Sequence, residues 1–234
     1  MVFLIENNKV DQFVRDYNEA ASDKYRATVE KGELLISILD RKLKKKGGPE
    51  ILRTCNRIKD VQEVIKKAKE KGLELELDEI EQNIHDIVGF RIVTTFRHEI
   101  YEIAEELKKI PGLNVIKVKD YIKNPKPSGY RSLHLITMIE VYTGESSQVI
   151  SAEIQIRDVL MDAWSNIEHK MKYKNDSVPA SLGSSFTKHA EVLNAFDEEI
   201  NTYEITEHQK NEDPMSNTAR VAHNEPVLEQ RIES

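Results

Sequence analysis

The segment from Ile87 to Phe96 constrains the fold most, because β-branched and aromatic residues dominate it. This composition is typical of a central β-strand. Apolar residues then recur at helical spacing from Ile100 to Ile110, and Pro111-Gly112 follows. That pattern predicts an amphipathic helix that stops before the Pro-Gly pair. A strand followed directly by a helix indicates an α/β sheet domain.

The same alternation continues along the chain. We expect further strands at 51–59, 113–122, 131–142 and 149–157, and helices at 60–71, 77–84 and 159–173. Amphipathic helices also precede and follow this region, and from Thr206 the composition becomes polar, which favours a flexible tail. The predicted organisation is therefore N-terminal helices over 1–48, a sheet domain over 49–176, a C-terminal helix over 177–205 and a tail over 206–234.

The composition excludes several classes of protein. Apolar residues make up 39% and charged residues 32% of 234 positions, as in soluble globular proteins. A net charge of −7 argues against a dedicated duplex-DNA binder. The single cysteine, Cys55, excludes an intrachain disulfide framework and a multi-cysteine zinc site. The apolar runs are too short to span a membrane, and the N-terminus lacks signal-peptide character, so we expect a cytoplasmic protein.

Two polar strands point to a nucleotide site. The segment from Tyr121 to His134 joins a basic loop, broken by proline and glycine, to a strand with Tyr130 and His134 on one face. Tyrosine offers a flat surface for a base, and the lysines offer charge for phosphates. About twenty residues later, Glu153, Gln155 and Arg157 share one face of a second strand. Alone, that strand would be an ordinary half-exposed one, but two such neighbours could line a single cleft.

Asp86 lies at the start of the central strand. A carboxylate at a strand end is a natural Mg²⁺ ligand, since Mg²⁺ takes one or two carboxylates together with substrate phosphates. Aspartate is also common there because it favours turns. Both interpretations stay open on this residue alone.

Taken together, these motifs resemble the synthetase domain of the RelA/SpoT family, in particular its small single-domain alarmone synthetases. The motifs occur in family order: Arg57-Ile-Lys59, Asp86-Ile-Val-Gly-Phe-Arg91, Lys119 to Lys126, Gly129-Tyr-Arg-Ser-Leu-His134, Glu153-Ile-Gln-Ile-Arg157 and Trp164 to Lys174. The resemblance covers about residues 53–175. It implies a mixed, mainly antiparallel sheet flanked by helices, similar to nucleotidyltransferases.

The resemblance also implies an activity. Family members transfer the β,γ-pyrophosphate of ATP to the 3′-hydroxyl of GDP or GTP, which forms (p)ppGpp and releases AMP. By position, Asp86 and Glu153 would be the catalytic and Mg²⁺-binding carboxylates. The ATP-binding residues would be Arg57, Lys59, Lys67 and Arg91. The residues around the acceptor would be Lys126, Tyr130, His134, Gln155, Asp162 and Glu168.

Three positions depart from the family pattern. Many relatives carry Ser in place of Glu63 and Arg in place of Glu70, both near the expected donor phosphates. The usual Thr after the Glu-x-Gln-Ile-Arg motif is Asp158. An acidic side chain facing a polyphosphate would repel it, so these residues raise a question about donor geometry and acceptor choice.

Two alternatives follow. Toxin-like relatives pyrophosphorylate the tRNA 3′ end and so block aminoacylation, and such a protein could have an antitoxin partner. The lysines at 42–46 or 66–69 could supply the basic surface that tRNA needs. The second alternative is a nucleotide- or RNA-binding module without turnover. Small relatives also assemble into tetramers through terminal helices, so a homo-oligomer is a further expectation.

Overall fold

The computed structural model describes residues 2–144, 146–174 and 180–212 of the chain. At its centre is a five-stranded sheet of order β1-β2-β5-β4-β3. The strands are β1 (Arg53–Ile58), β2 (Val88–Thr94), β3 (Leu113–Asp120), β4 (Leu133–Tyr142) and β5 (Ser147–Asp158). Strands β2 and β5 pair in parallel, and the other neighbours pair antiparallel. The predicted mixed, mainly antiparallel sheet is thereby confirmed.

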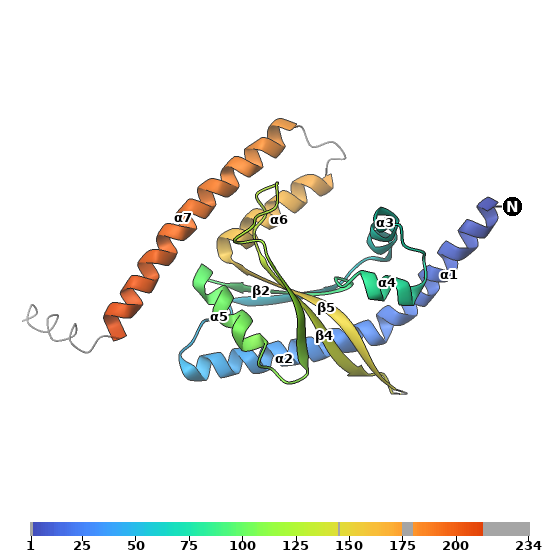
Figure 1. The fold of residues 1–234 in the computed structure, drawn as a ribbon, viewed down its shortest axis with the longest axis horizontal. Coiled ribbons are helices and arrows are strands. Elements are labelled where there is room, and N and C mark those ends of the chain that lie inside the picture. Colours follow the sequence, from blue (N-terminus) through green and yellow to red (C-terminus); the bar gives the residue numbers. More distant parts are fainter. Residues whose placement is uncertain (1, 145, 175–179, 213–234) are drawn as a thin grey trace, which may run out of the picture.

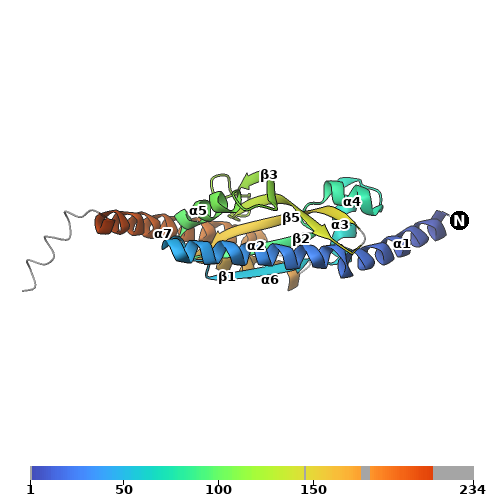
Figure 2. The same cartoon turned by 90° about the horizontal axis from the view of Figure 1, so that it is seen from below.

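Helices cover both faces of the sheet. They are α1 (Val2–Ser22), α2 (Lys24–Lys46), α3 (Val61–Lys71), α4 (Leu77–Asn83), α5 (Arg97–Leu107), α6 (Val159–Lys174) and α7 (Ala180–Glu212). Helix α2 lies along one face of the sheet and α6 lies on the other, while α7 runs beside α5 and α6 (Figure 1). Helix α1 continues the direction of α2 and projects beyond the sheet (Figure 2).

Local sequence explains where the helices end. Helix α2 stops at Gly47, whose left-handed backbone (φ 63°) lets its N–H reach the carbonyls of the last turn. Helix α3 begins after Asp60, which accepts a hydrogen bond from the backbone N–H of Gln62. It ends at Gly72 in the same left-handed conformation. These ends place α3, which carries Lys67, directly after β1.

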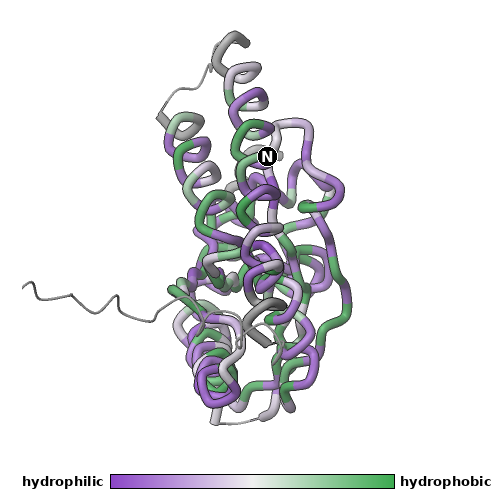
Figure 3. The backbone as a smooth tube through the Cα atoms, turned by 90° about the vertical axis from the view of Figure 1, so that its left-hand side faces the viewer, coloured by the Kyte–Doolittle hydropathy of each residue, from purple (hydrophilic) through white to green (hydrophobic). Residues whose placement is uncertain are grey.

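The core lies between the sheet and α2. Apolar residues at alternate positions of β2 and β5 point into it, including Phe90, Ile92, Ile154 and Ile156. The residues between them point to the opposite face of the sheet, as the period of two requires. Hydrophobic and hydrophilic stretches follow one another along the helical coils of the tube, as in amphipathic helices (Figure 3). In the described residues, no helix combines the length and apolar character needed to cross a bilayer.

The C-terminal helix differs from the expectation. It begins at Ala180 and continues to Glu212, seven residues beyond the predicted end at 205. Good helix formers such as Glu and Gln occur throughout 206–212, so a polar composition there does not interrupt the helix. The remainder of the expected tail, 213–234, lies outside the described residues.

Candidate active site

The register of the sheet aligns polar residues from all five strands on the face opposite α2. Cys55 of β1 pairs with Arg91 of β2, Arg91 with Gln155 of β5, Gln155 with His134 of β4, and His134 with Lys119 of β3. The neighbouring row contains Arg57, Gly89 and Glu153. Because paired residues point to the same face, segments far apart in sequence supply one continuous polar floor.

A cavity of about 660 Å³ opens over this floor. That volume is within the usual range for small-molecule sites. It is lined by Cys55, Asn56, Arg57, Lys67, Asp86, Gly89, Phe90, Arg91, Lys119, Tyr121, Lys126, Ser128, Tyr130, His134, Glu153, Gln155, Arg157, Ser165, Asn166, Glu168 and His169. Ten of the twelve predicted site residues therefore line one cavity, and Lys59 and Asp162 do not.

Asp86 lies at the cavity wall in the turn before β2, between two ammonium groups. Its Oδ2 accepts hydrogen bonds from Lys59 Nζ at 2.6 Å and from Lys67 Nζ at 2.7 Å. Burial raises the pKa of Asp86, but the two lysines outweigh burial and lower the pKa to about 2. Lys59 is only 8% exposed and lies behind Asp86, and burial lowers its own pKa. Lys59 thus contacts Asp86 and not the cavity.

Glu153 belongs to a closed ring of hydrogen bonds across the cavity floor. Arg157 Nη2 donates to the Tyr130 hydroxyl at 2.7 Å, the hydroxyl contacts His134 Nε2 at 2.8 Å, and His134 Nδ1 contacts Glu153 Oε1 at 3.0 Å. On the other side, Arg157 Nη2 donates to Gln155 Oε1 at 2.7 Å, and Gln155 Nε2 donates to Glu153 Oε2 at 2.8 Å. Both oxygens of Glu153 therefore have partners.

Arg157 and Glu153 fix the proton positions in this ring. A guanidinium only donates and a carboxylate only accepts, so the bonds run from Arg157 through Tyr130 and His134 to Glu153. His134 then carries its proton on Nδ1, and burial lowers its pKa, which favours the neutral ring. Burial raises the pKa of Glu153, but the bonds from His134 and Gln155 outweigh burial and lower the pKa to about 2. Glu153 is therefore ionised at neutral pH.

An aromatic cluster forms the other end of the cavity. The Tyr121 ring meets the His134 ring edge-on at a centroid distance of 5.0 Å and the Tyr130 ring at 6.2 Å. Lys126 Nζ lies over both tyrosines, 4.8 Å from the Tyr121 centroid and 4.7 Å from the Tyr130 centroid. The cavity lining therefore includes two tyrosine ring faces with a cation over them.

Arg57 and Arg91 come from the neighbouring strands β1 and β2, and both line the cavity. The arginine side chains are 55% and 32% exposed. Glu63, one of the atypical acids, turns toward Arg57, with an Nη1–Oε2 distance of 3.9 Å. Neither Glu63 nor the exposed Glu70 lines the cavity. Asp158, the third atypical residue, is fully buried outside it. None of the three acids is part of the cavity lining.

The prediction that Asp162 lies in the cavity around the acceptor is not met, because this residue has no exposed surface. Its Oδ1 accepts hydrogen bonds from Arg91 and Arg157 at 3.1 and 3.3 Å, and its Oδ2 accepts from Arg53 and Asn166. A buried carboxylate with this many donors is fully used in orienting them. Asp162 therefore holds the arginines of the site and is not part of the cavity lining.

Sequence reasoning left several lining residues out of the predicted site. The most consequential is Arg157, which is 2% exposed and donates to both branches of the hydrogen-bonded ring. The sequence could have identified Arg157, because it lies on the same face of the strand as Glu153 and Gln155. Tyr121 could have been found as the aromatic that opens the basic loop. Lys119 opens a family motif and could have been found in the same way, whereas Cys55 carries no such signal, since only strand pairing brings it to the floor.

The two carboxylates fit a magnesium ion. Asp86 Oδ1 is buried and has no hydrogen-bond partner, and Glu153 lines the same cavity. Within the described residues, no three His, Cys, Asp or Glu side chains gather into a metal cluster. A cation here would thus use two carboxylates and complete its shell with oxygens of a ligand, as Mg²⁺ commonly does with phosphates.

Comparisons with known proteins agree with this geometry. The family model described as the region found in RelA / SpoT proteins matches residues 56–178. The GTP pyrophosphokinase YwaC of Bacillus subtilis is 41% identical over 148 residues, 63% of this chain and 70% of YwaC. The crystal structure of B. subtilis small alarmone synthetase 2 matches with a TM-score of 0.71 and 36% identity, covering 81% of this chain and 98% of that one.

A further solved structure adds a ligand. B. subtilis small alarmone synthetase 1 bound to its product pppGpp matches with a TM-score of 0.71 and 30% identity, over 77% of this chain and 92% of that one. The family match covers just over half of the chain, in a segment that includes every predicted site residue. The chain belongs to the RelA/SpoT family and is similar to its small alarmone synthetases.

Proposed function

We propose that this protein is an ATP-dependent pyrophosphotransferase that moves the β,γ-pyrophosphate of ATP to the 3′-hydroxyl of GDP or GTP. The products are (p)ppGpp and AMP. The observation that carries the proposal is the shared cavity, whose lining combines Asp86 and Glu153 with arginines, lysines and an aromatic cluster. Relatives named GTP pyrophosphokinase support it, as does a structural neighbour that binds pppGpp.

The cationic end suits the donor. Arg57 and Arg91 can enclose adenine between their guanidinium planes, since arginine stacks well on flat π-systems. Lys67 lines the cavity and is one third exposed, so its ammonium can turn from Asp86 toward a triphosphate. Lys59 stays behind and keeps Asp86 ionised. Pyrophosphate transfer depends mainly on this kind of alignment and charge neutralisation.

The aromatic end suits the acceptor. A guanine base that stacks on Tyr130 takes the place of the Lys126 ammonium over that ring. Lys126 is then free to contact the acceptor phosphates. Tyr130 itself cannot swing away easily, because its hydroxyl is fixed by Arg157 and His134. The hydrogen-bonded ring therefore sets the plane in which the acceptor base stacks.

Glu153 is the group that would receive the 3′-hydroxyl proton. A Mg²⁺ ion held by Asp86 and Glu153 would lower the pKa of that hydroxyl and neutralise phosphate charge. Because both Glu153 oxygens are hydrogen-bonded, the carboxylate has one orientation and stays ionised until it accepts the proton. Its low pKa makes it a weak base alone, so proton transfer depends on a hydroxyl that has already become more acidic.

One experiment distinguishes this function from the alternatives. Purified protein is incubated with γ-labelled ATP and Mg²⁺, together with GDP, GTP or deacylated tRNA in separate reactions. We expect the label on guanine nucleotides. Label on tRNA would favour the toxin-like activity, and no transfer in any mixture would favour a binding module.

Replacing the presumed base tests the assignment directly. We expect Glu153→Gln to lose at least a hundredfold in turnover, about the contribution of a general base, while ATP still binds. The matched control is Glu140→Gln on the adjacent strand β4, because Glu140 is exposed and does not line the cavity. Wild-type turnover in Glu153→Gln would overturn the role.

The structure gives the tRNA alternative little support. Two lysines of the proposed basic surface have acidic partners, since Lys42 contacts Glu106 at 2.6 Å and Lys44 contacts Asp40 at 2.8 Å. The homo-tetramer, an antitoxin and a cytoplasmic location stay predictions. The first is compatible with exposed apolar residues on α7, including Phe196 and Tyr203. Light scattering after size-exclusion chromatography measures it.

A further inference from the structure

Helix α7 contributes no residue to the described lining of the cavity, yet it contacts both neighbours of Tyr130. On one side, Gly129 packs against Ala190 of α7. On the other side, Arg131 Nη2 donates to both carboxylate oxygens of Glu191, at 3.2 and 3.1 Å. Tyr130 therefore extends into the cavity from a backbone that α7 holds before and after it.

The Gly129 contact leaves no room for a side chain. Gly129 has φ +88°, a left-handed conformation, and a Cβ placed there would lie 2.5 Å from the Cβ of Ala190. Its backbone N–H donates to the Lys126 carbonyl at 2.8 Å, and Lys126 N–H donates to the Tyr130 carbonyl at 3.2 Å. This tight turn carries both Lys126 and Tyr130, so the placement of these two side chains depends on where α7 lies.

In the ion pair between Arg131 and Glu191, the arginine is buried and the glutamate is exposed. Arg131 is 9% exposed, and its Nη1 donates to the Gly129 carbonyl at 3.2 Å. The guanidinium thus ties the turn to Glu191 through a single side chain. Glu191 reaches it from the outside, with 58% of its own side chain exposed.

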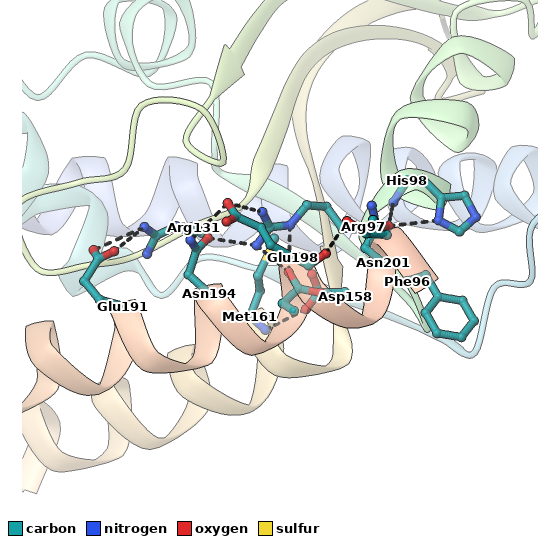
Figure 4. A network of polar contacts seen from close by, with 12 residues as sticks. Phe96, Arg97, His98, Arg131, Asp158, Met161, Glu191, Asn194, Glu198 and Asn201 are labelled. Atoms are coloured by element: carbon teal, nitrogen blue, oxygen red, sulfur yellow. Dashed lines mark hydrogen bonds and ion pairs between the residues drawn. The ribbon is translucent and has the colours of Figure 1, made fainter. Parts of the chain in front are cut away.

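A second set of contacts docks α7 without touching the turn. Arg97, at the start of α5, donates to Asp197, Asn194 and Glu198 of α7 at 2.7, 2.8 and 3.1 Å. The backbone N–H of His98 donates to Asn201 at 2.9 Å. Figure 4 shows both sets along the same side of α7. The helix is therefore docked at Arg97, and Glu191 makes a separate contact with the acceptor turn.

We infer that Glu191 is a positioning residue for acceptor binding, which acts through Arg131 to hold the turn that presents Lys126 and Tyr130. This role rests on the proposed function, because it assigns the acceptor nucleotide to Tyr130. Glu191 touches neither substrate. Its effect should therefore appear in the KM for the guanine nucleotide and not in the KM for ATP.

The chain offers a closely matched control. Glu191 and Glu198 lie on the same side of α7, two turns apart, with side chains 58% and 62% exposed. Each pairs with a mostly buried arginine, Arg131 or Arg97. Only the first of these arginines adjoins Tyr130. Comparing Glu191→Gln with Glu198→Gln therefore separates positioning of the turn from general docking of the helix.

We expect Glu191→Gln to raise the KM for GDP or GTP about two- to fivefold, the range for a half-exposed ion pair. The KM for ATP should stay within error, and Glu198→Gln should leave both constants unchanged. The double variant Arg131→Gln/Glu191→Gln should be no worse than Arg131→Gln alone, since both changes remove one contact. Equal changes in the two KM values, or equal effects of the two glutamate variants, would overturn the inference.

Hydrogen exchange tests the contact without using activity. Amides in 121–131 should exchange faster in Glu191→Gln than in wild type or Glu198→Gln, with unchanged thermal midpoints as the check on folding. Exchange that is unaffected in all three proteins would contradict the positioning role. If exchange behaves as expected while no guanine nucleotide is labelled in wild type, the contact stands and the proposed function is wrong.

Discussion

Asp162 has no exposed surface, yet it orients arginines at both ends of the cavity. Arg91 belongs to the donor end, and Arg157 supports Tyr130 at the acceptor end. Both donate to the same oxygen of Asp162. The two ends of the site are thus linked by a single carboxylate in the first turn of α6, where the helix dipole also favours negative charge.

Removing this charge should affect folding and both substrates. In Asp162→Asn, Arg157 keeps its charge in a buried place with a neutral partner, a change that costs about 3 kcal/mol or more. We expect that loss in urea unfolding, together with higher KM values for ATP and for the acceptor. Asp11→Asn, at an exposed position of α1, is the control and should stay within about 0.5 kcal/mol of wild type. A stable Asp162→Asn with normal KM values would contradict the assigned role.

At the scale of elements, the junction of β5, α6 and α7 contains two buried acids. Asp158 ends β5 and accepts a hydrogen bond from Met161 N–H at 2.8 Å, as a residue that caps the start of α6 does. It also faces Asp197 of α7, which Arg97 binds. Burial is the largest cause that raises the pKa of Asp158 to about 7, and the charge of Asp197 adds to it. The atypical residue of the motif thus serves helix packing.

This raised pKa predicts a direction of pH dependence. Between about pH 4 and pH 7, folded Asp158 keeps a proton that the unfolded chain has released, so its contribution to stability falls as pH rises through that window. Asparagine caps a helix as well as aspartate and does not titrate. We therefore expect the thermal midpoint of Asp158→Asn to rise relative to that of wild type from pH 5 to about pH 7, and the difference to level off above that pH. Parallel midpoint curves for the two proteins would exclude this effect.

At the scale of the molecule, α2 supports the cavity from behind. It crosses the far face of the sheet, and Gly32 lets it lie directly against the ring of Phe90. A Cβ on Gly32 would overlap that ring. Phe90 sits between Gly89 and Arg91, which belong to the cavity floor. The distance between α2 and the sheet therefore bears on the shape of the site.

A larger residue at this contact should destabilise the fold. Gly32→Val places three carbons where the Phe90 ring lies, and overpacking of this kind costs about 1–3 kcal/mol. Gly183→Val is the matched control, because that glycine is also helical and has open space around its Cα. Valine and glycine differ little in helix propensity, so the control should change by less than about 0.5 kcal/mol. Urea unfolding of both variants measures the difference, and equal losses would refute the packing argument.

The sequence by itself determined the strands, most helix limits and the faces of the site strands. Glu153, Gln155 and Arg157 had to share a face because side chains alternate along a strand. The family motifs then identified most of the residues that line the cavity. Whether β2 would pair with β5 was not encoded in any local pattern, since these strands lie far apart in the chain.

Tertiary structure alone decided which polar side chain meets which partner. Asp162 and Asn166 lie one turn apart on the same side of α6, yet the first is buried among arginines and the second lines the cavity. The contact of Glu63 with Arg57, the burial of Asp158 and the contact of Glu191 with Arg131 likewise depend on how helices pack. Local periodicity fixes the side of an element on which a residue lies, whereas hydrogen-bond partners depend on distances between elements that only packing sets.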